Sequence, residues 1–165
     1  MTAFADSSAL VKLYVGETGH EQVDGLPALV IAQVSRVEVP SAFWRKHRLG
    51  ELSAEDARIL TVEFEADFFG DREHRPRFAA IGTTVAMLDE AARACATHGL
   101  RAYDAVQLSS AQVARRQDPA CDTVAAFDRT LRRAAAAEGF ALIPPVLEPS
   151  PATPDPPAPN PATGD

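Results

Sequence analysis

The sequence predicts an α/β fold, a three-layer α/β/α sandwich with a mainly parallel sheet. Two observations lead to this prediction. Short apolar runs alternate along the chain with helical patterns, the order expected where helices connect parallel strands. The apolar runs are continuous and do not alternate with polar residues, as expected for strands that helices cover on both faces.

Five apolar runs are the candidate strands of this sheet. In chain order they are 2–5 (TAFA), 28–34 (ALVIAQV), 78–81 (FAAI), 123–127 (TVAAF) and 140–143 (FALI). No internal repeat is visible among them. A chain of 165 residues with 46% hydrophobic residues is long enough for one domain with a sizeable core.

Helical patterns occupy the segments between the runs. Ser53 is a candidate N-cap with Asp56 three residues later, which is a capping-box pattern. Gly50 and Gly99 are candidate helix ends. The helical patterns lie within 7–17, 35–50, 53–70, 83–99, 102–116 and 129–139.

The composition changes at Pro144. Residues 144–165 hold nine of the thirteen prolines and no basic residue, so they cannot build a core. We expect a folded domain over residues 1–143 and a disordered or locally extended tail over residues 144–165. A solubilising role for this tail is preferred to a proline-rich ligand for a partner.

Charge and cysteine content limit the functional class. A net charge of −7 argues against broad, salt-driven binding to nucleic acid, but an acidic catalytic pocket whose charge bound cations cancel stays compatible with it. Cys95 and Cys121 lack metal-ligand spacing and are expected to be reduced and buried. With neither a signal peptide nor an apolar run of about 18 residues, the chain is expected to be cytoplasmic, with no membrane association.

Acidic residues follow three of the expected strands. Asp6 and Asp128 come directly after the runs 2–5 and 123–127, and Glu38 comes four residues past the run ending at Val34. Ligands of open α/β sheets bind outside the carboxyl ends of the strands. Asp6 and Asp128 could instead be helix N-caps, and Glu38 could close a capping box with Ser35.

Asp104 is the fourth acid and lies near the start of an apolar helix. Leu100, Leu108 and Ala111 share its face, so an isolated carboxylate there would be costly. The structural alternative to a functional role is a buried salt bridge to Arg101 or Arg45.

Four carboxylates at one edge of a sheet cannot all stay ionised without cations. Mg²⁺ or Mn²⁺ suits them, since these hard ions prefer oxygen ligands. The four histidines are scattered and no cysteine pair suggests zinc. Carboxylate-held Mg²⁺ is a common means of hydrolysing phosphodiesters, in which one ion activates water and another stabilises the leaving oxygen.

These residues resemble the PIN-domain ribonucleases, and within them the VapC-type toxins of bacterial toxin–antitoxin (VapBC) pairs. The resemblance covers nearly all of residues 2–143 in family order, and its most specific blocks are LRAYDAVQL and DSSALVKLY. The other matching stretches are SRVEVPSAFWRKHRLGELSAEDA and VAAFDRTLRRAAAAEGFALI.

The resemblance implies a metal-dependent endoribonuclease that binds Mg²⁺ or Mn²⁺. The catalytic and metal-binding acids carried over by motif are Asp6, Glu38, Asp104 and Asp128. The family often has Ser or Thr two residues before its last acid, where this chain has Ala126, so Ser7 and Ser8 remain as pocket hydroxyls. The resemblance also implies a homodimer and a cognate VapB-type antitoxin that brings a basic side chain towards the acids.

We expect Asp6 and Asp104 to be the main metal ligands. Glu38 would help to hold the metal or orient the attacking water, and Asp128 would complete the pocket or bind a second ion. Metal-activated water would then cleave a single-stranded or loop segment of RNA. The mixed aromatic and basic segment SAFWRKHRLG could face RNA or antitoxin, or be a solvated helix face.

Three alternatives to a toxin nuclease are open. A haloacid-dehalogenase-like phosphatase needs a second Asp where the chain has Ser8, and a receiver-like domain needs paired acids near the first strand. The third is an inactive or housekeeping PIN-fold protein that binds or processes RNA. Metal binding and RNA cleavage by the purified chain would separate an inactive protein from the nuclease.

Overall fold

The computed structural model describes residues 2–70 and 72–147. Five parallel strands form one sheet in the order β3-β2-β1-β4-β5. The strands are β1 (Ala3–Ala5), β2 (Leu29–Ala32), β3 (Phe78–Ile81), β4 (Thr123–Ala125) and β5 (Ala141–Ile143). The strand order reverses between β1 and β4, and ligands of such sheets bind at that point, outside the carboxyl ends.

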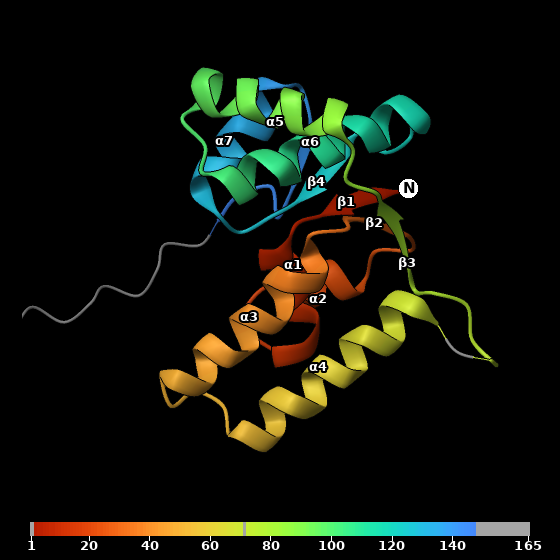
Figure 1. Cartoon of the computed structure of the whole chain (residues 1–165), viewed down its shortest axis with the longest axis vertical. Coiled ribbons are helices and arrows are strands. Elements are labelled where there is room, and N and C mark those ends of the chain that lie inside the picture. Colours follow the sequence, from red (N-terminus) through yellow and green to blue (C-terminus); the bar gives the residue numbers. More distant parts are fainter. Residues whose placement is uncertain (1, 71, 148–165) are drawn as a thin grey trace, which may run out of the picture.

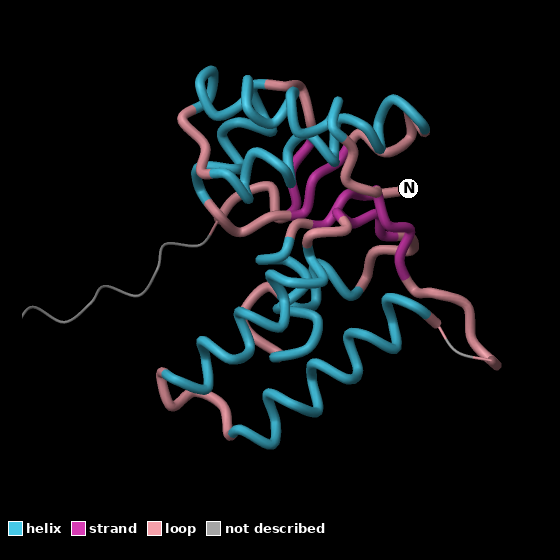
Figure 2. Tube along the Cα trace, viewed as in Figure 1, coloured by secondary structure: helices cyan, strands magenta, loops and turns pink. Residues whose placement is uncertain are grey.

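Helices connect every pair of consecutive strands and cover both faces of the sheet (Figure 1). Helices α5 to α7 lie above the sheet in that view and α1 to α4 lie below it, so the sheet is the middle layer (Figure 2). The helices are α1 (Ser7–Val15), α2 (His20–Asp24), α3 (Ser35–Arg48), α4 (Ala54–Phe69), α5 (Val85–His98), α6 (Ala102–Gln117) and α7 (Arg129–Ala137).

The two faces of the sheet build two separate cores. Phe4, Val30 and Val124 pack against the layer of α5, α6 and α7. Ala5 and Ile31 belong to the opposite core with α1, α3 and α4. Alternate residues of a strand point to opposite faces, so both sets must be apolar, which explains the continuous apolar runs of the sequence.

The predicted fold class is confirmed, and the differences are local. Strand β2 ends at Ala32, before Val34, and β4 ends at Ala125. Helix α2 was not predicted, because its five residues bury only Val23 and carry no readable period. The capping box of Ser53 and Asp56 is confirmed at the start of α4.

The proposed capping box of Ser35 and Glu38 is wrong. Helix α3 includes Ser35 as its first residue, and Val34 is the N-cap without a side-chain hydrogen bond. Pro40 lies inside α3 without ending it. The Glu38 carboxylate is therefore free of a capping role and bonds to other helices.

The expected tail lies mostly outside the described residues, since only residues 144–147 of it are described. Over the described part of the chain, no helix is both long and apolar enough to cross a membrane.

Candidate functional site

Asp6 follows β1 directly and is 4% exposed. Its Oδ1 caps α1 by accepting the backbone N–H of Ala9 at 3.0 Å and the hydroxyl of Ser8 at 2.7 Å. Asp6 is thus the N-cap of α1, and its Oδ1 is the oxygen that fills this role. Among the described residues, nothing donates a hydrogen bond to Oδ2, so one carboxylate oxygen stays available.

Burial is the main influence on the acidity of Asp6. It raises the pKa of this carboxyl to about 7, although the hydrogen bonds from Ser8 and Ala9 act in the opposite direction. The negative charge of Glu38 adds to the increase in pKa. Among the described residues Asp6 forms no ion pair, and burial therefore favours its protonated form, although the charge of Arg132 is near enough to interact with it.

Glu38 lies in the first turn of α3 and its Oε2 accepts two hydrogen bonds from other helices. The hydroxyl of Ser7 donates at 2.8 Å and Nε2 of Gln107 donates at 2.6 Å. The same Nε2 lies 2.8 Å from Ser7 Oγ and 3.1 Å from Ser35 Oγ. This network ties α1, α3 and α6 together and fixes one oxygen of Glu38.

Gln107 was missed by the sequence reasoning. Its side chain is 2% exposed, and its Oε1 is buried without a hydrogen-bond partner among the described residues. The available signal was its position three residues after Asp104, which places both side chains on one face of α6.

Asp104 is half-buried in the first turn of α6. Within the described ranges, its carboxylate makes no hydrogen bond or ion pair, so neither Arg101 nor Arg45 forms the suggested salt bridge. Burial raises the pKa of Asp104, the charges of Asp128 and Glu38 raise it further, and Arg101 opposes them. The Asp104 carboxylate thus has no ion-pair partner among the described side chains.

Asp128 is exposed and caps α7. Its Oδ1 accepts the backbone N–H groups of Thr130 and Leu131, both at 2.8 Å. It is close enough to Asp104 to raise the pKa of that residue. The expected N-cap role is thus present, as at Asp6, together with an electrostatic link to the other acids.

The structure brings the four acids to one edge of the sheet. Each lies at the N-terminus of a different helix, as N-cap or in the first turn. A helix N-terminus carries partial positive charge, which offsets part of the repulsion between carboxylates. Electrostatic effects connect Asp6 with Glu38, and Asp104 with Glu38 and Asp128.

The four acids are near one another, but their side chains do not converge on a single position. In the described part of the chain, no three His, Cys, Asp or Glu side chains converge closely enough to hold a metal ion. The oxygen-only donor set still fits a hard cation, because Mg²⁺ usually binds through one or two carboxylates and keeps several waters.

Ser8 and Arg132 connect this edge to the end of β4. Ser8 Oγ accepts the backbone N–H of Phe127 at 2.8 Å while donating to Asp6. The buried guanidinium of Arg132 donates to the carbonyl oxygen of Ala126 at 2.8 Å and to that of Pro144 at 2.6 Å. Burial lowers the pKa of Arg132, and the charge of Asp6 opposes that change.

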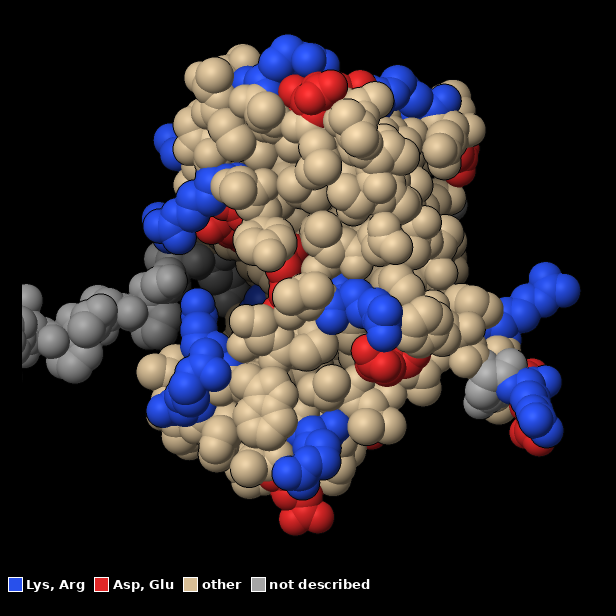
Figure 3. All heavy atoms as spheres, in the orientation of Figure 1, with Lys and Arg blue, Asp and Glu red and all other residues tan. Residues whose placement is uncertain are grey.

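The basic end of α3 is partly engaged within the protein. Lys46 forms ion pairs with Glu17 and Glu51. Figure 3 shows basic side chains on both sides of the indentation between the upper and lower layers, with acidic side chains among them.

No family model matches the chain, and no curated protein matches it. Among solved structures, it resembles PAE2754 from Pyrobaculum aerophilum at 23% identity, with a TM-score of 0.56 over 81% of this chain and 79% of the other. It also resembles a chain of a toxin-antitoxin complex from Klebsiella pneumoniae at 17% identity, with a TM-score of 0.50 over 76% and 86%. At these identities the likeness shows a shared fold.

Proposed function

We propose that this chain is a Mg²⁺- or Mn²⁺-dependent endoribonuclease of the PIN type and the toxin of a toxin–antitoxin pair. The observation that carries the proposal is the unpaired Asp104 carboxylate, which lies within electrostatic reach of Glu38 and Asp128 at the carboxyl edge of the sheet. Such an arrangement needs a cation that the described side chains do not supply.

Asp6 and Asp104 are the proposed cation ligands, since each has a carboxylate oxygen without a hydrogen-bond donor among the described residues. A bound divalent cation supplies the activation of water and the stabilisation of the leaving 3′ oxygen. The contacts of Ser8 and Ala9 with Oδ1 orient Asp6 and leave its Oδ2 for this role.

Glu38 is the proposed acceptor for the attacking water. Gln107 and Ser7 fix its Oε2, which leaves Oε1 to receive a hydrogen bond from a water molecule. Asp128, held as the N-cap of α7, completes the acidic edge or contacts a second cation. RNA is the proposed substrate, as a single-stranded or loop segment whose backbone can reach an edge of this kind.

A partner protein and a second copy of the chain are proposed on separate grounds. One similar structure is a toxin-antitoxin complex, and this chain exposes large apolar side chains on α3 and α4. They are Val37, Ile59, Val62 and Phe69, each about half exposed or more. Such side chains suit a protein interface, and we propose a VapB-type antitoxin and a homodimer as the occupants.

The test is RNA cleavage by purified Asp104→Asn protein with added Mg²⁺ or Mn²⁺. Asn keeps the shape of the side chain and removes its charge, so we expect cleavage to fall by about a hundredfold or more. Asp89→Asn, on the exposed surface of α5, is the matched control and should cleave normally. Growth arrest on expression and co-purification with the product of the neighbouring gene test the toxin role.

A folded Asp104→Asn protein with undiminished cleavage would falsify the site assignment. An unmodified chain that binds RNA but cleaves none under any divalent cation would support the alternative, an inactive PIN-fold RNA-binding protein.

A further inference from the structure

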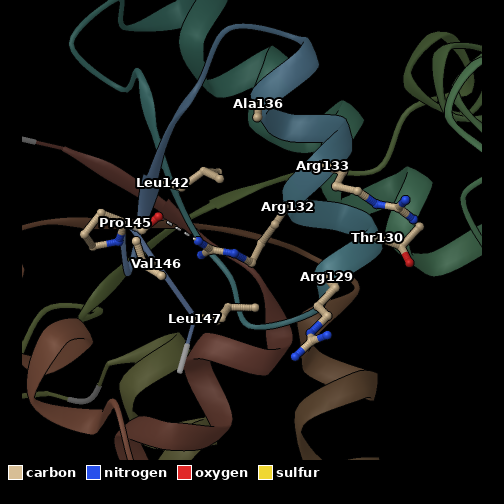
Figure 4. Close-up of a pocket in the computed structure, with 9 residues that line it drawn as sticks. All are labelled: Arg129, Thr130, Arg132, Arg133, Ala136, Leu142, Pro145, Val146 and Leu147. Atoms are coloured by element: carbon tan, nitrogen blue, oxygen red, sulfur yellow. Dashed lines mark hydrogen bonds between the residues drawn. The ribbon is translucent and has the colours of Figure 1, made fainter. Parts of the chain in front are cut away.

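A cleft of about 750 Å³ lies between α7 and the chain that leaves β5. Figure 4 shows its lining side chains, with the arginines on α7 and the apolar residues on the opposite segment. Leu142, Pro145, Val146 and Leu147 form that apolar wall. A cleft of this size can hold a group as large as a nucleotide.

The charged residues that line this cleft, within the described part of the chain, are basic. Among the described residues that line it are Arg129, Arg132 and Arg133, and none of these described lining residues is acidic. Arg132 is committed to the carbonyl oxygens of Ala126 and Pro144 and so holds the cleft in shape. Arg129 and Arg133 are exposed, and no residue in the described ranges forms a hydrogen bond or ion pair with either guanidinium.

The two uncommitted arginines lie four residues apart on α7, so they share one face of the helix. Guanidinium groups match the geometry of phosphate oxygens and bind them bidentately. Figure 4 shows the Arg133 side chain extending from α7 away from the apolar segment, so these two groups lie at the rim of the cleft. Cations at the rim and an apolar wall within suit a ligand with repeated phosphates and flat apolar parts, which describes a nucleic-acid strand.

The cleft adjoins the acidic edge. Arg129 directly follows Asp128, and the charge of Arg132 interacts with that of Asp6. A strand whose scissile phosphate lies at the acids would therefore pass the arginines on one side. The chain as a whole carries a charge of −7, so a polyanion needs local cations of this kind near four carboxylates.

We propose that this cleft binds the nucleotides of single-stranded RNA that flank the cleaved bond, with Arg129 and Arg133 on consecutive phosphates. This inference rests on the proposed ribonuclease function and adds a substrate-binding surface to it. In this proposal the cleft binds the RNA, and the acids at the sheet edge catalyse its cleavage.

The experiment measures binding without cleavage. A short fluorescein-labelled single-stranded RNA of mixed sequence is titrated with the full chain in EDTA, and anisotropy is recorded at several salt concentrations. Removing two phosphate contacts by Arg129→Ala with Arg133→Ala should lower the slope of log K against log salt by about 1.4. At about 0.15 M salt this corresponds to roughly tenfold weaker binding.

A second variant tests the apolar wall. Val146 is 77% exposed, so Val146→Asp should leave the fold intact while placing a negative charge in the cleft, and binding should weaken. Matched controls are Val85→Asp on α5, where the side chain is 78% exposed, and Arg58→Ala on α4, where the side chain is also exposed. Both controls should bind RNA as the unmodified chain does.

Equal RNA affinity and equal salt dependence in the cleft variants and the controls would overturn the proposal, as would absence of RNA binding by the unmodified chain. Poly-glutamate that binds where RNA does not would assign the cleft to an acidic protein partner and also overturn it. Metal-dependent cleavage is assayed separately. If the unmodified chain binds RNA through the cleft but does not cleave it, only the proposed ribonuclease function is rejected. If the chain cleaves RNA but its cleft variants bind RNA normally, only the proposed role of the cleft is rejected.

Discussion

Gln107 shows how single residues determine the state of this site. Its Nε2 donates a hydrogen bond of 2.6 Å to the carboxylate of Glu38, which lies 69 positions earlier in the sequence. Gln107 is buried and Glu38 is half-buried. A hydrogen bond to a carboxylate is stronger than one between neutral groups. Gln107 therefore positions Glu38 without being a ligand itself.

Replacing Gln107 with Leu keeps the volume of the side chain and removes its donor. We expect kcat for RNA cleavage to fall by about 10–100-fold, the usual effect of losing a group that orients a ligand residue, while KM for RNA stays unchanged. Steady-state cleavage kinetics on the purified variant, with urea unfolding to confirm its fold, measure this.

Gln112→Leu is the control, because Gln112 lies on the same helix and donates a hydrogen bond to Glu138, away from the four acids of the candidate site. A Gln107→Leu protein that changes KM and leaves kcat intact would contradict the positioning role. So would two variants with the same cleavage rate.

The positions of the four acids at the carboxyl edge of the sheet could be predicted from the sequence, and their hydrogen-bond partners could not. Asp6 and Asp128 follow strands, and a strand end is readable from an apolar run. Arg132 and Gln107 bond to groups that only the folded topology brings near. Their burial among apolar residues gives no periodic signal that distinguishes them from surface residues.

Helices bring the site together at the scale of the element. The acids lie at the N-termini of α1, α3, α6 and α7. Helices α1, α3 and α7 start at the carboxyl edge because each follows the end of a parallel strand, whereas α6 follows α5. Gly99, with φ of 66°, ends α5 in the left-handed conformation and turns the chain towards α6 and Asp104.

Strand and helix identities were readable where patterns were long, as in α4 with its capping box. The first and last residues of these elements were harder to predict from the sequence. The chain leaves β2 at Ala32, and the polar and apolar residues up to Val34 form a turn that composition does not separate from the strand. Pro40 inside α3 shows that packing against α1 and α4 overrides a local breaker.

The capping box of α4 gives a prediction on stability. Ser53 Oγ accepts the N–H of Asp56 at 3.0 Å, and Asp56 Oδ2 accepts from the backbone and hydroxyl of Ser53. Ser53→Ala should lower the free energy of unfolding by about 1 kcal/mol, measured by urea denaturation.

Ser41→Ala, at an exposed position inside α3, is the control and should be neutral or slightly stabilising because Ala is the better helix former. Cleavage should be unaffected by Ser53→Ala, since α4 lies away from the acids. An unchanged denaturation midpoint for Ser53→Ala would show that α4 is held by its apolar contacts with α3 alone.

The four acids at one edge of the sheet affect the stability of the whole protein. Two apolar cores, one on each face of the sheet, stabilise a fold whose edge accumulates uncompensated negative charge. The stability of the metal-free protein should therefore depend on pH, with Asp6 as the largest single contributor we identify.

The sign follows from the proton that Asp6 retains. In the folded protein its pKa is raised to about 7 from 3.8, so between these values the folded state binds a proton that the unfolded state has lost. The free energy of unfolding contributed by Asp6 then falls as pH rises from about 4 to about 7, at up to about 1.4 kcal/mol per pH unit, and levels off above.

Urea unfolding of the metal-free chain and of Asp6→Asn between these pH values measures the difference. The variant cannot ionise at this position, so its stability should fall less steeply, and Asp89→Asn should match the unmodified chain. Added Mg²⁺ should stabilise the unmodified chain most above pH 7, because a carboxylate must lose its proton before it can hold a cation. Parallel pH profiles for Asp6→Asn and the unmodified chain would contradict the buried, proton-retaining Asp6, and equal stabilisation of both by Mg²⁺ would contradict its role as a ligand.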